Sequence, residues 1–384
     1  MNHASSGRGR AVLMLAHFAG MIDLVALPVW VGALVQHYRF DLEHAGMVVT
    51  AFLLGAVVAS LLAAPRFNIL PHRLLAMGGY AGAAVAFACA SQVSDFAVLL
   101  PLHALAGLCL GTGLSMVHGA IGRSANPHRL FAMAGAALGV GAVVFYGAVP
   151  PAIAAGGGQT LFFVFAGLMA VTAAACSAFP HIATDPQHAQ RHAPLSRVAW
   201  LAVLGVTCMA LNQSITFAML DRVGVMRGFG QERVNMVLLV CGFVNLLPAV
   251  LAGLLQQRLS ATRVALIAPL VQATLAVIIA SSPTFEPYAL AASVFAAVMI
   301  FTHTFLFGLI ARLDPSGRAV ASTPAMMMTG AAIGPALAGS VAMRAGFDGL
   351  AVLAVVVGIA ATCAFAYVSR HGRSAAGTPL AVVK

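Results

Sequence analysis

The sequence predicts an all-α membrane protein with about 12 transmembrane helices arranged as two pseudo-symmetric bundles of six. Two observations lead to this prediction. The 384 residues are 61% hydrophobic and only 8% charged, whereas a soluble domain carries roughly 25% charged residues. The apolar residues also form long runs separated by short polar turns, without the alternation of an outer-membrane barrel. A core of this size could not bury so much apolar surface, so lipid must serve as part of the solvent.

Each apolar run of about 20 residues is expected to form one membrane-spanning helix. The first six lie at 12–36, 45–64, 74–93, 97–121, 130–151 and 161–179, and the second six at 198–220, 234–255, 264–281, 288–311, 319–343 and 349–368. The longest polar interval separates the sixth run from the seventh. We therefore expect an N-terminal bundle at 11–179, a cytoplasmic linker at 180–196, a C-terminal bundle at 197–370 and a cytoplasmic tail at 371–384.

The distribution of basic residues predicts the orientation of the chain. With twelve spans, the side of the membrane opposite the termini receives five of the 20 Lys and Arg residues, and the side of the termini receives the other 15. The five are Arg39, Arg222, Arg227, Arg233 and Arg344. Cytoplasmic loops carry the excess of Lys and Arg. We therefore expect a multi-pass protein of a bacterial-type inner membrane with both termini in the cytoplasm.

The remaining composition argues against other classes of protein. The net charge is +10, but single basic residues scattered over short loops do not form a nucleic-acid-binding surface. The six cysteines lie singly in apolar runs without a CxxC pair, which indicates small hydrophobic side chains rather than a metal site. His181, His188 and His192 lie in the linker without supporting ligands, so we expect no bound metal and no cofactor.

A weak internal repeat relates the two halves at an offset of roughly 190 residues. Arg73 follows the second span as Arg263 follows the eighth. The segment Gly135-Ala-Ala-Leu-Gly139 is similar to Gly330-Ala-Ala-Ile-Gly334. Repeats in the same orientation place two bundles around an axis along the membrane normal.

On these features the chain resembles the major facilitator superfamily from about Met14 to Ser369. The eleventh span contains Gly330-xxx-Gly334-Pro335-xxx-Gly339, which looks like the Gly-Pro-rich pattern of that family. The loop after the second span retains basic residues but lacks the glycine and aspartate of the family's best-known motif. We expect Gly330, Gly334 and Gly339 to lie where two helices pack closely against each other.

Asp23 is the first candidate for a functional residue, because it lies in the middle of the first span. A charged side chain at the bilayer centre costs about 2.5–3.5 kcal/mol on insertion scales, and such residues usually mark a solute or proton pathway. The repeat places Gln213 opposite Asp23, next to Asn212 in the seventh span. On this count Asp23 is the only carboxylate deep within a span.

The resemblance implies that the first, fourth, seventh and tenth helices line a central cavity. His103 and His303, in the fourth and tenth spans, then become candidates for contact with a solute or a proton. Weaker cavity candidates are Asn245, Gln272, Tyr80 and Tyr146. For all of these polar residues the alternative is a hydrogen bond between packed helices.

The expected function is secondary active transport of a small organic solute by alternating access, with the proton gradient as energy source. An acid without Lys or Arg in the cavity slightly favours efflux of lipophilic or weakly basic compounds. The alternatives are proton-coupled uptake of a small organic solute and a non-transporting sensor on a transporter scaffold.

An enzyme is not expected, since paired intramembrane carboxylates, a His-Glu-x-x-His motif and a phosphate-binding Gly-Lys-Ser/Thr loop are all missing from the sequence. The expected partners are the small-molecule substrate and the lipid bilayer, and the protein is expected to be a monomer that does not bind nucleic acid.

Overall fold

The computed structural model describes residues 7–124, 127–181, 197–255, 258–313 and 323–375. Within these ranges the ordered elements are α-helices and two short 3₁₀ helices, without strands. Most of the predicted linker and the last part of the predicted tail lie outside the described residues.

The first half of the chain forms seven α-helices and both 3₁₀ helices. They are α1 (Gly7–Gly20), α2 (Asp23–Gln36), α3 (Leu42–Ala63), η2 (Ala64–Ile69), α4 (His72–Ala90), α5 (Phe96–Gly122), α6 (Pro127–Gly156), α7 (Gln159–Ala175) and η3 (Cys176–Ala178). Local chemistry sets several of these boundaries. The side chain of Asp95 caps α5 by accepting a hydrogen bond from the N–H of Ala97 at 2.6 Å. Gly157 has a φ of 80° directly after α6, a conformation that favours glycine and ends the helix.

The second half forms α8 (Arg197–Met226), α9 (Gln231–Val244), α10 (Pro248–Leu255), α11 (Ala261–Ser281), α12 (Phe285–Leu313) and α14 (Thr323–Ala375). Gly346 has a φ of 64° and divides α14 into two helical segments. The two segments correspond to the eleventh and twelfth predicted spans.

The helices account for the twelve predicted passes. Ten continuous stretches of the described chain are long and apolar enough to cross a membrane. The last of them, Met326–His371, contains two passes separated at Gly346. One further pass consists of α9 and α10, which are each too short to cross alone.

Two passes that we predicted as single helices are interrupted. The first, predicted over 12–36, has a two-residue turn between α1 and α2, and Pro28 removes a further backbone donor within α2. The eighth, predicted over 234–255, is broken at residues 245–247, directly before Pro248. Hydropathy remains high through both turns, so an apolar run alone did not reveal them.

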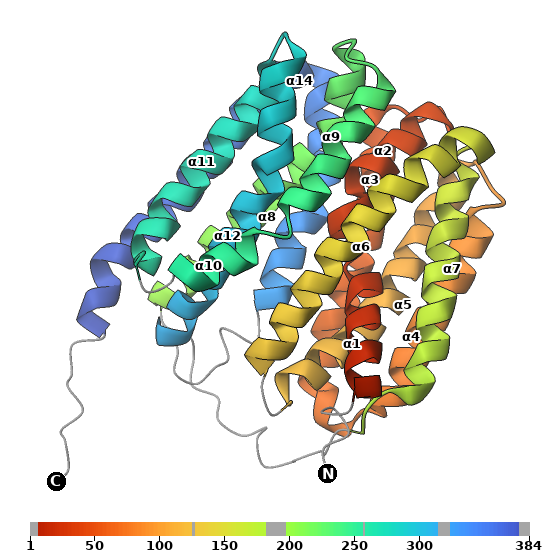
Figure 1. Ribbon diagram of the computed structural model, residues 1–384, viewed down its shortest axis with the longest axis horizontal. Helices are drawn as coiled ribbons and strands as arrows, with labels where there is room; N and C mark the ends of the chain where they lie inside the picture. The colour runs from red at the N-terminus through yellow and green to blue at the C-terminus, as the bar shows by residue number, and fades with distance from the viewer. Residues whose placement is uncertain (1–6, 125–126, 182–196, 256–257, 314–322, 376–384) are drawn as a thin grey trace.

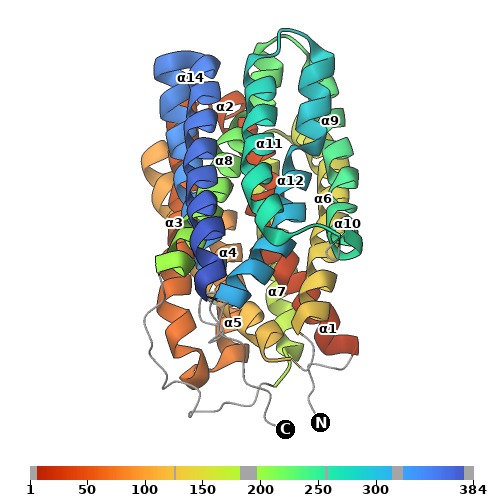
Figure 2. The same cartoon turned by 90° about the vertical axis from the view of Figure 1, so that its left-hand side faces the viewer.

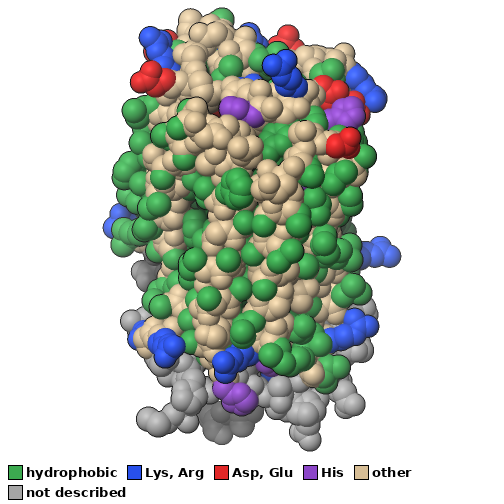
Figure 3. Space-filling model, turned by 90° about the vertical axis from the view of Figure 1, so that its right-hand side faces the viewer, with side chains coloured by type: hydrophobic (Ala, Val, Ile, Leu, Met, Phe, Trp, Pro, Cys, Tyr) green, Lys and Arg blue, Asp and Glu red, His purple; other side chains and the backbone are tan. Residues whose placement is uncertain are grey.

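The outside of the helix bundle is apolar around its middle. Large side chains such as Leu290, Leu254 and Val352 are 71%, 70% and 64% exposed. Figure 3 shows this hydrophobic belt on one face, with acidic side chains gathered at the end of the molecule away from the termini. Exposed apolar surface on this scale is the surface that lipid covers.

Among the described residues, the two halves contact each other mainly through α3 with α14, α2 with α8, and α6 with α9. The tightest approaches between α3 and α14 have Gly46 against the backbone of Pro335 and Gly339 against the backbone of Leu42. The hydroxyl of Ser340 also donates to Glu43 at 2.9 Å. In Figures 1 and 2 both termini lie at the end of the bundle that is opposite to these contacts between α3 and α14. The described contacts between α3 and α14 and between α2 and α8 therefore gather at the end away from the termini.

Candidate functional site

The turn in the first pass lies beside Asp23. The helix α1 ends at Gly20, and α2 begins at Asp23 itself. The side chain of Asp23 is 5% exposed and lies close to the backbone N–H groups of Asp23 and Leu24. A negative group at the start of a helix is stabilised by the unpaired N–H groups and by the helix dipole. The broken helix thus makes a buried position for this carboxylate.

Two tyrosines hold the first pass on either side of the turn. The hydroxyl of Tyr80 on α4 donates to the carbonyl of Ala16 at 2.6 Å. The hydroxyl of Tyr146 on α6 donates to the carbonyl of Val25, also at 2.6 Å. Both rings are buried. Two of the four weaker candidates from the sequence therefore contact the backbone of the pass that contains Asp23.

Tyr146 also links the first pass to the other half of the molecule. A Cβ placed on Gly242 of α9 would lie 3.3 Å from the ring of Tyr146. Three residues further on, the eighth pass breaks at Asn245, whose amide donates to the sulfur of Cys241 at 3.5 Å. The amide oxygen of Asn245 is buried without a hydrogen-bond partner in the described chain. The interruptions in the first and eighth passes thus approach each other through Tyr146, and we take this region as the candidate site.

The amides of the seventh pass bond within the C-terminal half. Gln272 on α11 donates to the side-chain oxygen of Gln213 and to the carbonyl of Met209, both at 3.2 Å. Asn212 makes a longer bond of 3.5 Å to the carbonyl of Ala354. Gln213, which the repeat places opposite Asp23, is therefore hydrogen-bonded to Gln272 of its own half. The bond from Gln272 to Met209 matches the bond from Tyr80 to Ala16 at an offset of about 190 residues.

The two candidate histidines lie in different surroundings. His103 on α5 is fully buried among the rings of Trp30, Phe87 and Phe162, at centroid distances of 5.5, 5.8 and 5.1 Å. Its Nδ1 lies 2.7 Å from the carbonyl of Leu99, to which it can only donate. The structure thus places His103 in an aromatic cluster of the N-terminal half. His303 lies on α12 in the other half and is partly buried.

Asp221 and Arg222, which follow directly after the predicted seventh span at 198–220, form a buried charged pair. They lie within α8, are 2% and 4% exposed, and form an ion pair at 3.0 Å. The amide of Gln231 donates to Asp221 at 2.6 Å, and Gln36 at the end of α2 donates to Gln231 at 2.6 Å. Asp23 is therefore not the only carboxylate within a pass, and this polar network joins the two halves.

A second missed pair consists of His17 on α1 and His118 on α5. The Nδ1 of His17 lies 3.1 Å from the Nε2 of His118, and the ring centroids are 5.2 Å apart. The two residues are far apart in the sequence, so their proximity had no local signal. In the part of the chain that the structure describes, no group of three or more His, Cys, Asp or Glu residues could hold a metal ion.

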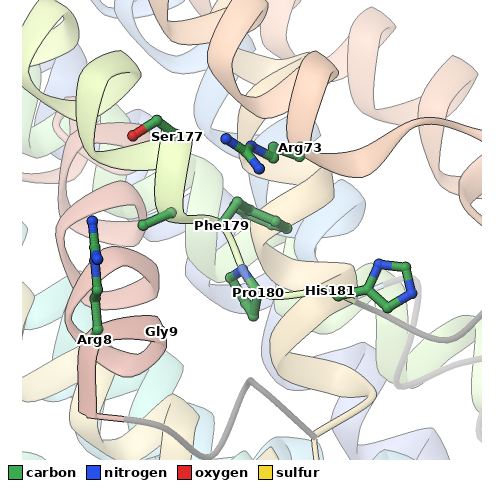
Figure 4. Close-up of a pocket in the computed structure, with 8 residues that line it drawn as sticks. Arg8, Gly9, Arg73, Ser177, Phe179, Pro180 and His181 are labelled. Atoms are coloured by element: carbon green, nitrogen blue, oxygen red, sulfur yellow. The ribbon is translucent and has the colours of Figure 1, made fainter.

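An open cleft of about 350 Å³ lies at the end of the bundle that holds the termini. Figure 4 shows Arg8, Arg73, Phe179, Pro180 and His181 among the residues that line it. Arg8 precedes Asp23 by 15 residues, or about 20 Å of helix. This basic cleft is therefore separate from the candidate site.

The arrangement so far defines a membrane protein built of two helical bundles, with broken passes and with a buried carboxylate beside the break in the first pass. The sequence profile of the Major Facilitator Superfamily matches residues 13–323, so the chain belongs to this family of membrane transporters. Among curated proteins, no relative matches the chain.

Solved structures of the same family share the fold. The chain is similar to the nucleoside transporter NupG, with 14% identity, a TM-score of 0.70, and coverage of 94% of this chain and 99% of that one. It is also similar to a bacterial homologue of the human lysosomal transporter Spinster, with 13% identity, a TM-score of 0.70, and coverage of 98% and 100%. The transporter FucP gives 15% identity, a TM-score of 0.63, and coverage of 95% and 99%. At these identities the likeness concerns the fold.

Proposed function

We propose that this protein is a proton-coupled secondary transporter of a small organic solute, with Asp23 as a site of proton or solute binding. The observation that carries the proposal is the buried carboxylate at the helix break in the first pass. Discontinuous helices near the bilayer midplane commonly form the binding sites of secondary transporters. Burial favours the neutral form of a carboxyl group, so binding and release of a proton can be linked to a change of surroundings.

The charges around the site favour a neutral or weakly basic solute. Asp221, the other buried acid of the passes, is paired with Arg222. In the described chain, the polar groups close to the carboxylate of Asp23 are backbone N–H groups rather than a cationic side chain. An anionic solute would meet an acid without a nearby cation, whereas a weak base could pair with it. This slightly favours efflux of lipophilic or weakly basic compounds over uptake of a small organic solute.

We further propose that the protein lies in a bacterial-type inner membrane as a monomer, with both termini in the cytoplasm. In that orientation the end closed by α3, α14, α2 and α8 faces outward. The structure then corresponds to the state of the alternating-access cycle that is closed to the outside. Opening that end would require the contacts of Gly46 and Gly339 to separate.

The deciding experiment measures solute flux in liposomes for the wild type and for Asp23→Asn. The panel contains a weakly basic amphiphile, a neutral nucleoside and an anionic compound. Asn keeps the size of Asp but fixes the neutral form, so gradient-driven accumulation is expected to be lost while solute-for-solute exchange persists. The exposed Asp348 provides the matched control, and Asp348→Asn is expected to transport normally.

Three results would distinguish the alternatives for Asp23 and for the protein as a whole. Loss of cation binding with retained binding of neutral solutes would assign Asp23 to a cationic solute rather than to the proton. Unchanged flux and pH dependence in Asp23→Asn would reduce Asp23 to a packing residue. Absence of flux for every compound in the wild type, with specific binding of one of them, would favour the sensor alternative.

A further inference from the structure

His17 and His118 form a buried pair that the mechanism above does not use. His17 is 8% exposed on α1, and His118 is partly buried on α5. Their facing nitrogens, Nδ1 of His17 and Nε2 of His118, are separated by 3.1 Å, which is a hydrogen-bond distance. In a neutral pair one ring must donate its N–H and the other must accept with its lone pair.

Such a pair is suited to hold one additional proton. Each neutral ring has two nitrogens and one proton, and the bond occupies one nitrogen of each ring. An added proton can enter on the remaining nitrogen of the donating ring. The bond between the rings then becomes a charge-assisted hydrogen bond, which is shorter and stronger than the neutral one. A second added proton would place N–H against N–H and break the bond, so the pair takes one proton.

The same geometry allows the proton to cross from α1 to α5. When a proton binds to the free nitrogen of the donating ring, the shared proton can move to the accepting ring. That ring then releases its own proton from its far nitrogen, so one N–H bond forms and one breaks on each ring. One proton has moved, and both rings are neutral again with donor and acceptor exchanged.

The elements packed against α1 carry few other ionisable groups among the described side chains. These elements are α5, α6, α7 and η3. The sequence of α7 contains no ionisable side chain, and Tyr80 of α4 bonds to the carbonyl of Ala16 next to the pair. The other described titratable side chains on α1 and these elements are Arg8, Arg10, His103, Cys109, Tyr146 and Cys176, with Arg123 at the end of α5. A metal ion is disfavoured because the described chain supplies two ligands here rather than three.

The position of the pair suits a proton route. His17 precedes Asp23 by six residues, or about 9 Å of helix, toward the end of the bundle that holds the termini. That end is opposite the contacts of Gly46 and Gly339. We propose that His17 and His118 are a second proton-binding site, which exchanges protons between the terminal side of the membrane and the region of Asp23. This inference rests on the proposed proton coupling but concerns a site that can be tested without transport.

The test measures the protons taken up by purified protein in detergent when the pH is lowered from about 8 to about 5, the range in which histidine titrates. Wild type is compared with the double variant His17→Gln/His118→Gln, because Gln can donate and accept without binding a proton. The double variant is expected to take up about one proton fewer than the wild type, whereas each single variant keeps one histidine that can still bind a proton. The control His103→Gln removes a buried histidine of the same half that is bonded to the backbone instead of to a second histidine. It is expected to leave the contribution of the pair intact.

A second measurement needs no variant. In protein labelled with ¹⁵N-histidine, a nitrogen–nitrogen dipolar correlation selects rings as close as 3.1 Å. Both selected rings are expected to shift together over the same pH range, as coupled groups do. Equal proton uptake by the wild type and the double variant, or ring signals that do not change with pH, would overturn the proposal and leave the pair as a structural link. If the wild type transports none of the tested solutes but still takes up more protons than the double variant, the proposed function is overturned and the proton-binding site is kept.

Discussion

The carboxylate of Asp221 lies directly against Gly32, so that a Cβ placed on Gly32 would come within 2.5 Å of the carboxylate Oδ2. Gly32 belongs to α2 in the first half and Asp221 to α8 in the second. The contact therefore depends on the halves being closed at this end. Any side chain at Gly32 must push the two helices apart or displace the charged pair.

Gly32→Ala is expected to weaken this closed arrangement by about 1–3 kcal/mol, the usual cost of overpacking. The measurement is disulfide formation between Glu43→Cys and Ser340→Cys, which replace a pair joined at 2.9 Å across the same end. Cross-linking should be slower in Gly32→Ala. The matched control is Gly167→Ala on α7, where nothing lies within 4 Å of an added Cβ. Equal cross-linking in both variants would contradict the tight contact.

Asp221 and Arg222 provide the second prediction. Removing one member of a buried ion pair leaves an uncompensated charge and costs about 3–5 kcal/mol. Asp221→Leu is therefore expected to lower the free energy of unfolding substantially, whereas Asp221→Leu combined with Arg222→Met should recover most of the loss. Unfolding in detergent by a chemical denaturant measures both. A double variant as unstable as the single one would show that the pair stabilises through other contacts, such as the bond from Gln231.

These two residues also show where sequence reasoning stops. Twelve passes could be predicted because each needs a long apolar run, and Asp23 stood out as an acid within one. Asp221 and Arg222 are adjacent opposite charges near the end of a run, a pattern that equally describes a loop. Their burial depends on Gln231 and Gln36, which belong to other helices. His17 and His118 likewise meet only when α1 packs on α5. The turns at 21–22 and 245–247 lie within apolar runs, and only the second has a local signal, Pro248 directly after it.

The third prediction concerns the pH dependence of the start of α3. The carboxylate of Asp41 accepts hydrogen bonds from the backbone N–H and the ring Nδ1 of His44, at 2.7 and 2.8 Å. Partial burial opposes ionisation, but these bonds and the charge of His44 outweigh it and lower the pKa of Asp41. The stabilisation is therefore present above the unfolded value of about 3.9 and is lost as the pH falls through the lower folded value.

Asp41→Asn cannot titrate, so its stability should fall less than that of the wild type between about pH 6 and about pH 3. The difference is measured by unfolding at several pH values in this interval. The exposed Asp348 serves as control, and Asp348→Asn is expected to follow the wild type. An identical pH dependence of the wild type and Asp41→Asn would mean that the cap does not stabilise the folded state.

The fourth prediction concerns orientation. In a variant without native cysteines, a probe at Thr284→Cys, in the loop before α12, should react with an impermeant reagent added to intact cells. A probe at His181→Cys, at the end that holds the termini, should react only after the membrane is opened. Thr284 is preferable to Gly157 and Gly228 in the neighbouring loops, because their φ values of 80° and 81° make a cysteine strained. The reverse labelling pattern would place the termini outside.

The last prediction separates the two tyrosines that hold the first pass. Tyr80→Phe and Tyr146→Phe each remove one hydroxyl that donates at 2.6 Å to a backbone carbonyl of this pass. Both rings remain, so each variant should lose only about 1 kcal/mol of stability. Tyr146 in addition faces Gly242 of the other half, next to the break at Asn245. If the turn beside Asp23 must adjust as the halves move, freeing Val25 from Tyr146 should alter the rate of transport more than freeing Ala16 from Tyr80. Initial rates in liposomes, normalised to folded protein, give the comparison. Equal rates in the two variants would show that both bonds only stabilise the N-terminal half, and would remove Tyr146 from the candidate site.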